Sequence, residues 1–117
     1  MQKYFVNFTN HPSTKWDEKQ RMAALEYGEI VDISFPVVDP LGDESYIDRL
    51  AETCLQQILL FQPQAVLCQG EFCLAFRVIS RLREKGILVL AACSERKVRE
   101  DAQKKEVIFQ FQQLRKY

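Results

Sequence analysis

Short apolar runs alternate with amphipathic stretches along the chain, and polar turns separate them. The first run, Tyr4–Phe8, is aromatic and β-branched and stops at a turn-forming group, so it predicts a strand. A capping-box pattern from Thr14 to Asp17 opens the next segment, which ends at Gly28 and predicts a helix. Apolar residues then alternate in Ile30–Phe35 and predict a second strand.

The middle of the chain repeats this alternation with stronger signals. Apolar residues recur at intervals of three and four over 46–59, which predicts an amphipathic helix. The continuous apolar runs Ala65–Cys68 and Ile87–Ala92 are typical of strands that are covered on both faces. Between these runs, the turn Gln69–Glu71 leads into a third helix, and Gly86 ends that helix.

The last segment changes character. Residues 95–106 are dominated by charged and amide side chains, and we interpret them as a solvated connection rather than a mobile cover over a site. Residues 107–112 alternate between apolar and polar side chains, which predicts a fifth strand returning antiparallel at the edge of the sheet.

These elements predict a single Rossmann-like α/β domain over residues 1–117. Parallel crossovers are right-handed and sequential strands tend to be neighbours, so the simplest strand order is 2-1-3-4-5. The sheet is then mostly parallel and five-stranded, with three helices and an antiparallel last strand. Ligands of such sheets bind beyond the carboxyl ends of the strands, where the order reverses.

The amino-acid composition limits the classes of binding partner and the cellular location that we expect. Sixteen Lys and Arg balance sixteen Asp and Glu, so no overall field favours duplex nucleic acid or an anionic membrane. No segment has the roughly 20 apolar residues of a membrane span, and no leader precedes the first strand, so we expect a cytoplasmic protein. The four cysteines lie in apolar stretches, and we interpret them as buried thiols: Cys54, Cys68, Cys73 and Cys93.

Three polar turns follow the first, third and fourth strands and converge on one rim of the predicted sheet. His11, the only histidine, could act there as an acid, a base or a donor, or could simply cap a turn. Gly70 permits close backbone approach before a helix N-terminus that could hold an anion, although a plain strand-to-helix turn has the same pattern. The candidate ligand-binding residues are Asn10, Ser13, Gln69, Gly70, Glu95 and Arg96.

Two other chemistries receive little support. Cys93 and Arg99 have the Cys-x5-Arg spacing of thiolate phosphatases, but the intervening residues are bulky where such loops need small ones. The lone histidine and scattered carboxylates form no recognisable metal-ligand set, so we predict no metal site and no cofactor.

The opening run, Tyr4-Phe5-Val6-Asn7-Phe8-Thr9-Asn10-His11-Pro12, followed by an acidic-capped helix, resembles small stand-alone CRISPR-associated proteins with Rossmann-like folds. Some of these are ring nucleases. The resemblance implies a homodimer that binds a cyclic oligoadenylate messenger at paired strand-end surfaces and cuts it without a metal, ending an antiviral signal. Positioning and charge stabilisation would supply most of the catalysis. On this reading the catalytic candidates are His11, Glu71 and Ser94.

Other functions remain open at the sequence level. A non-catalytic nucleotide sensor or dimerising module would have the same pocket, and turnover separates it from an enzyme. A small hydrolase or transferase acting on a nucleotide or sugar would use Glu71 or Glu95 as its acid or base, with a raised pKa. The aromatic residues Tyr4, Trp16 and Tyr46 are interpreted as core or interface residues rather than base-stacking platforms.

Overall fold

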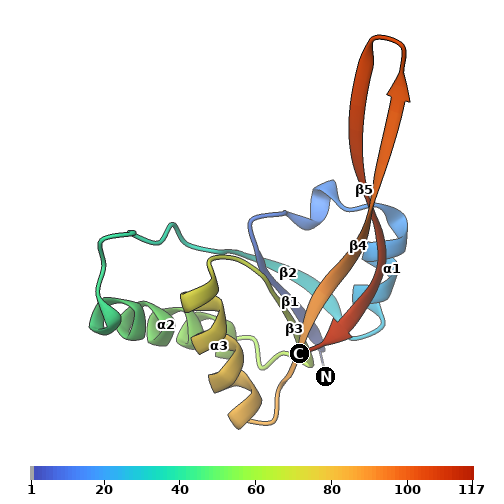
Figure 1. The fold of residues 1–117 in the computed structure, drawn as a ribbon. Helices are drawn as coiled ribbons and strands as arrows, with labels where there is room; N and C mark the ends of the chain where they lie inside the picture. The colour runs from blue at the N-terminus through green and yellow to red at the C-terminus, as the bar shows by residue number, and fades with distance from the viewer. Residues whose placement is uncertain (1) are drawn as a thin grey trace.

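The computed structural model describes residues 2–117, which form an α/β fold on one five-stranded sheet (Figure 1). The spatial order is β2-β1-β3-β4-β5, with every neighbouring pair parallel except the antiparallel pair β4 and β5. The predicted fold class, strand order and strand directions are therefore confirmed. The strands are β1 (Tyr4–Thr9), β2 (Glu29–Ser34), β3 (Ala65–Cys68), β4 (Leu88–Asp101) and β5 (Lys104–Lys116).

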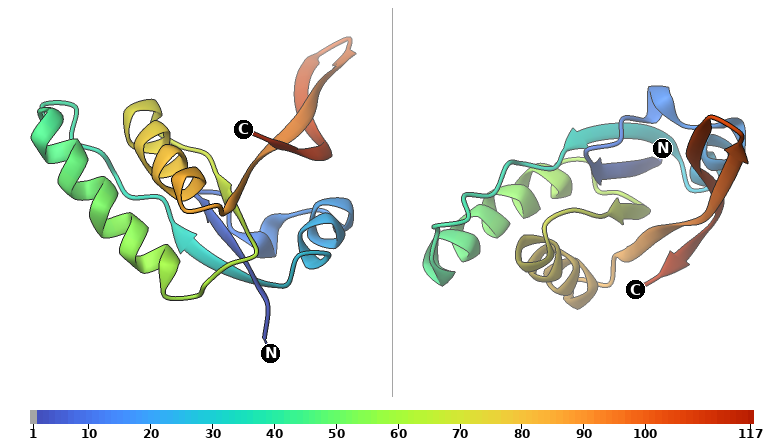
Figure 2. Two further views of the ribbon diagram at one scale, coloured as in Figure 1. Left: turned by 90° about the horizontal axis from the view of Figure 1, so that it is seen from below. Right: turned by 45° about the horizontal axis from the view of Figure 1, so that its top comes forward.

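Helices cover both faces of the sheet. Within residues 2–117 they are α1 (Glu18–Leu25), α2 (Glu44–Leu59), α3 (Phe72–Glu84) and the short 3-10 turn η1 (Ser13–Lys15). α2 and α3 lie on one face and α1 lies on the other (Figure 2). No helix in the described part of the chain has the length and apolar character needed to cross a membrane.

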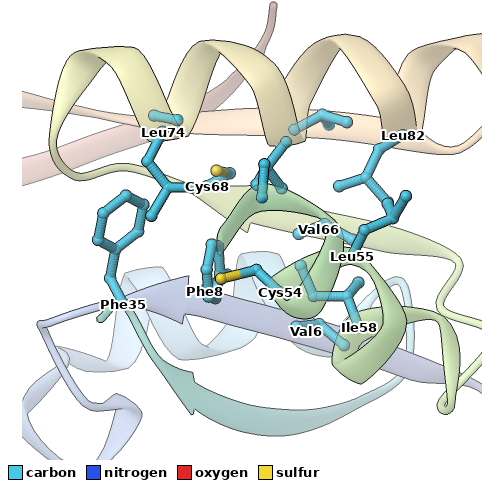
Figure 3. Close-up of a cluster of buried hydrophobic side chains, with 14 residues drawn as sticks. Val6, Phe8, Phe35, Cys54, Leu55, Ile58, Val66, Cys68, Leu74 and Leu82 are labelled. Carbon is cyan, nitrogen blue, oxygen red and sulfur yellow. The ribbon is translucent and has the colours of Figure 1, made fainter. Parts of the chain in front are cut away.

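The larger apolar core lies between the sheet and the helices α2 and α3 (Figure 3). Phe8 and Val66 of the sheet meet Ile58 of α2 and Leu82 of α3, and all four side chains are fully buried. Burying an aliphatic or aromatic side chain of this size contributes about 1.5–3 kcal/mol. The apolar stripe that predicted α2 is thus the surface that fixes this helix on the sheet.

The helix predicted to begin at Thr14 begins later. Ser13–Lys15 forms η1, and Trp16 then takes an extended backbone conformation with φ −73° and ψ 151°. Its indole is buried beside Phe5, with ring centroids 6.4 Å apart. Asp17 is the actual N-cap of α1, because its carboxylate accepts the backbone N–H of Gln20 at 2.8 Å. Burial of Trp16 interrupts the helix, so the predicted Thr14 capping box is wrong.

Residues 95–106 form the outer part of a long β-hairpin instead of a solvated connection. β4 and β5 pair in register from Ser94 with Phe111 to Asp101 with Lys104, and a bulge at Cys93 and Ser94 bends the ribbon. The hairpin projects beyond the rest of the molecule (Figure 1). Toward its tip, three successive cross-strand pairs join opposite charges, beginning with Arg99 and Glu106, and such pairs favour a paired hairpin over a loop.

The four cysteines differ in exposure, and the expectation that all are buried is wrong for Cys73 and only partly met by Cys93. Cys54 and Cys68 lie in the larger core (Figure 3), Cys93 is half-buried, and Cys73 is exposed on α3. Burial raises the pKa of the Cys68 thiol to about 12, so this thiol is protonated and unreactive at neutral pH.

Candidate functional site

A groove of about 880 Å³ lies at the carboxyl ends of β1 and β3 and beside the middle of β4, near the rim where the sequence predicts a ligand site. We call it the strand-end groove. The turn after β1 and the N-terminal part of α1 form one wall of it, and residues of β4 and β5 form another. The side chains that matter for its chemistry are His11, Lys15, Gln69, Ser94, Phe109 and Phe111.

A buried amide fixes the wall that carries His11. Asn7 is fully buried on β1, and its Nδ2 donates to the His11 carbonyl at 3.0 Å and to Asp32 Oδ1 at 2.8 Å. Its Oδ1 accepts the Thr9 hydroxyl at 2.8 Å. A buried polar group that lost such partners would cost about 1–3 kcal/mol, so Asn7 strongly favours this one turn conformation.

Two further hydrogen bonds hold the His11 backbone. The Trp16 indole donates through Nε1 to the His11 carbonyl at 3.1 Å, and the His11 N–H donates to the Thr9 hydroxyl at 3.1 Å. The His11 residue itself remains exposed on the groove wall. A rigid backbone with an accessible imidazole is the arrangement that proton transfer to or from a bound ligand requires.

The sequence places Ser13 among the ligand-binding residues, but Ser13 does not line the strand-end groove. Its hydroxyl donates to Asp32 Oδ2 at 2.9 Å, and its N–H donates to the same carboxylate. Asp32 lies on β2 and also receives the Asn7 amide. This carboxylate therefore joins β2 to the turn after β1, and Ser13 has a structural role in that link.

The three residues of the turn after β3, Gln69–Glu71, have different roles. Gln69 lines the groove, and its Oε1 accepts the Ala92 N–H of β4 at 2.9 Å. Gly70 also lines the groove, but packing explains its lack of a side chain, because a Cβ there would lie 2.6 Å from the Phe35 ring. The close approach at Gly70 is thus made by an aromatic side chain of the core.

Glu71 differs most from the sequence expectation. Its two carboxylate oxygens accept the N–H groups of Cys73 and Leu74 at 2.8 and 2.9 Å, so Glu71 is the N-cap of α3. These bonds, that of Leu74 first, lower the pKa of the Glu71 carboxyl. The N-terminus of α3 is already occupied by a carboxylate, and Glu71 is outside the groove lining. Its expected catalytic role is not supported.

The three candidates after β4 alternate along the hairpin. Ser94 and Arg96 point to the same side as their cross-strand partners Phe111 and Phe109, because directly opposed residues in an antiparallel pair share a face. Ser94, Phe109 and Phe111 line the groove. Glu95 belongs to the opposite face, so it is turned away from the groove and its expected ligand-binding role is not supported.

Sequence reasoning missed Lys15 and the aromatic character of the groove. Lys15 lies in η1, four residues after His11, and a lone lysine in a turn gives no signal of its own. The sequence places Trp16 in the core or at an interface, and the residue is buried, yet it also contributes to the groove lining. The sequence predicts an edge strand for Phe109, and only the pairing of β4 with β5 places this residue in the groove.

The phosphatase-like spacing of Cys93 and Arg99 has no counterpart in three dimensions. Both residues lie on β4, and a strand rises about 3.3 Å per residue, so about 20 Å separate them. A phosphate-binding loop would bring them together around one ligand. Among residues 2–117, no three His, Cys, Asp or Glu side chains gather as metal ligands would.

Comparison with models of protein families shows which family the chain belongs to. A family model described as "Uncharacterized protein MJ1673 family" matches residues 3–115, which include both walls of the strand-end groove. No curated protein matches the chain.

Proposed function

This chain belongs to the MJ1673 family, and we propose that it is a ring nuclease. In this proposal it binds a cyclic oligoadenylate messenger at the strand-end groove and degrades it in the cytoplasm without a metal ion. The protein acts as a homodimer and ends an antiviral signal.

The observation that supports this function is the composition of the strand-end groove. His11 and Ser94 provide an imidazole and a hydroxyl, and Lys15 provides a cation, within one cavity. Phe109 and Phe111 add aromatic surface to the same cavity. A nucleotide needs both kinds of surface, because its bases stack on aromatic rings and its phosphates require cations and hydrogen-bond donors.

The proposed reaction is an internal transesterification. A ribose 2′-oxygen attacks the adjacent phosphorus, the bond to the 5′-oxygen of the next nucleotide breaks, and a 2′,3′-cyclic phosphate with a free 5′-hydroxyl results. His11 accepts the 2′-hydroxyl proton, and the 5′-oxygen takes up a proton from the imidazolium or from water. Lys15 and Ser94 stabilise the charge on the non-bridging phosphate oxygens.

The structure does not favour the alternative of a hydrolase or transferase that uses Glu71 or Glu95 as its acid or base. A hydrolase that used Glu71 would need an accessible carboxyl with a raised pKa, whereas capping of α3 lowers the pKa of Glu71. Glu95 lies on the hairpin face turned away from the groove. A sensor without turnover remains the competitor, since the same groove would bind the messenger without cutting it.

Exposed apolar surface on α3 supports the homodimer. Phe72 and Phe76 are 90% and 70% exposed, and they line a second cavity of about 690 Å³. Exposed apolar patches of this kind mark interaction surfaces. Gln69 and Gly70 line both this cavity and the strand-end groove, so a two-fold contact through α3 would bring two grooves side by side.

The decisive experiment follows cyclic tetra- and hexa-adenylate by chromatography, with the purified protein in the presence and absence of a chelator. We expect linear products in both conditions. Replacing His11 with alanine removes the proposed base and should slow cleavage by about 10²- to 10⁴-fold. Lys15→Ala should weaken binding and cleavage, whereas the control Lys19→Ala, on the exposed surface of α1, should leave both unchanged.

The outcomes separate the candidates. Cleavage that depends on His11 and resists the chelator supports the ring nuclease. Tight binding without products identifies a sensor, and the absence of both binding and cleavage by the wild-type protein rejects the messenger altogether.

A further inference from the structure

The projecting part of the β4–β5 hairpin has two unlike faces. Cross-strand pairing places Ser94 with Phe111, Arg96 with Phe109 and Val98 with Val107 on one side. We call these six residues the inner face. The outer face holds the intervening pairs, which are Glu95 with Gln110, Lys97 with Ile108 and Arg99 with Glu106.

The inner face carries an exposed apolar stripe. Phe111, at its base, is buried, but Phe109 is 68% exposed, and Val98 and Val107 are 41% and 40% exposed. A two-stranded ribbon has little stability of its own in water, so it gains nothing from presenting a phenylalanine to solvent. The stripe is therefore suited to contact with a ligand.

This stripe is continuous with the strand-end groove. Phe111, Phe109 and Ser94 belong both to the inner face and to the groove lining. The next cation outward is Arg96, directly opposite Phe109. Opposed residues have Cβ atoms about 5 Å apart, so a base stacked on Phe109 would hold its phosphate within reach of the Arg96 guanidinium.

Charge also distinguishes the two faces. The six residues of the inner face include one arginine and no carboxylate, and the next pair outward on this side, Glu100 with Lys105, is balanced. On the outer face, Lys97 and Arg99 are balanced by Glu95 and Glu106. A polyanionic ligand in the strand-end groove would thus find an uncompensated cation, Arg96, on the inner side. Because the chain as a whole has no net charge, such local asymmetry determines where phosphates bind.

We propose that the bound ligand extends out of the strand-end groove onto the inner face, where Phe109 stacks on a second base and Arg96 contacts the phosphate beside it. This inference rests on the proposed function and makes it more specific. A strand rises about 3.3 Å per residue, so the inner face from Ser94 to Val98 is about 13 Å long, of which the half up to Phe109 already lines the groove. The site therefore selects ligands of several nucleotides over a single nucleotide.

The test uses calorimetric binding of cyclic tetra-adenylate, linear penta-adenylate and AMP. The inner-face double variant Arg96→Gln/Phe109→Ala is compared with the outer-face double variant Lys97→Gln/Ile108→Ala, which removes the same kinds of side chain one position along. We expect the inner-face variant to bind both oligonucleotides on the order of 10- to 100-fold more weakly, as expected for loss of one stacked base and a phosphate contact. Its affinity for AMP should be unchanged.

Several results would overturn the inference. Equal losses in the two double variants would indicate a general charge effect, and equal losses for AMP would place both residues inside the mononucleotide site. A change of sedimentation in the inner-face variant would assign this face to contact between copies. Selective loss of linear penta-adenylate binding, in a protein that neither binds nor cuts the cyclic ligand, would keep the inference and reject the ring nuclease.

Discussion

Hydrogen-bond partners divide the polar residues that follow the strands into two groups. The Ser13 hydroxyl donates to Asp32, and the Glu71 carboxylate caps the N-terminus of α3. His11 and Ser94 line the strand-end groove. Residue types and spacing cannot make this distinction, because a serine or glutamate in a turn serves equally well as a cap or as a reactive group.

The cap formed by Glu71 predicts a pH-dependent stability. Because folding lowers the pKa of this carboxyl, its stabilisation is complete above the ordinary glutamate pKa and is lost as the pH falls through the folded value. Glu71→Ala should cost about 1 kcal/mol in free energy of unfolding at pH 7, the usual magnitude for an N-cap. Urea denaturation at several pH values should show the difference from wild type shrinking below about pH 4.

The last turn of the same helix offers a matched control. Glu84→Ala removes a carboxylate from the C-terminal end of α3, where the helix dipole does not favour it, so no comparable loss should follow. A pH-independent loss in Glu71→Ala would show that the carboxylate is not what stabilises the helix.

Among the elements, the β4–β5 hairpin combines a structural and an exposed part. Phe111, near its base, is buried against the α1 side of the sheet, whereas residues 97–108 contain no buried side chain. The structural contribution of the hairpin should therefore end near the bulge, and its projecting part should be separable from the fold.

Shortening the hairpin tests this division. Replacing residues 97–108 with Asn-Gly joins Arg96 directly to Phe109 through a two-residue turn of the kind that suits hairpins. The melting temperature should change little, because the removed residues bury no core side chain. The comparison variant Phe111→Ala leaves a cavity at a buried position. Its free energy of unfolding should fall by about 3–5 kcal/mol, and its melting temperature should fall with it.

A large loss of melting temperature in the shortened protein would show that the projecting hairpin supports the fold after all. Calorimetric melting of both variants under one buffer condition makes the comparison direct.

For the whole molecule, the two exposed apolar surfaces lie on different elements and suit different partners. The inner face of the hairpin continues the strand-end groove, whereas Phe72 and Phe76 lie on α3 beside the second cavity. A ligand on the first surface and a second copy on the other would cover both without competition.

The proposed assembly can be tested by sedimentation. We expect the wild-type protein to sediment as a dimer and Phe76→Glu to sediment as a monomer, because a buried charge at an apolar contact opposes association. Leu60→Glu is the matched control, since Leu60 is 82% exposed at the end of α2, away from the second cavity. A wild-type monomer at micromolar concentration, or equal effects of the two variants, would contradict an interface on α3.

The sequence by itself determined the architecture. Apolar periodicity located the helices α2 and α3, continuous apolar runs marked the buried strands, and the handedness of crossovers then left one simple strand order. These signals are local, or depend on a general rule of chain connection, so they can be read without coordinates. The position of the groove at the strand ends follows from the same order.

Tertiary structure decided which side chains meet. Asn7 of β1 and Asp32 of β2 are 25 residues apart in the sequence, and the hydrogen bond between them helps to hold the His11 turn. Phe109 enters the groove because of the β4–β5 register, and a shift by one residue would replace it on this face. Such pairings join residues that are far apart in the sequence, so residue types and local spacing do not predict them.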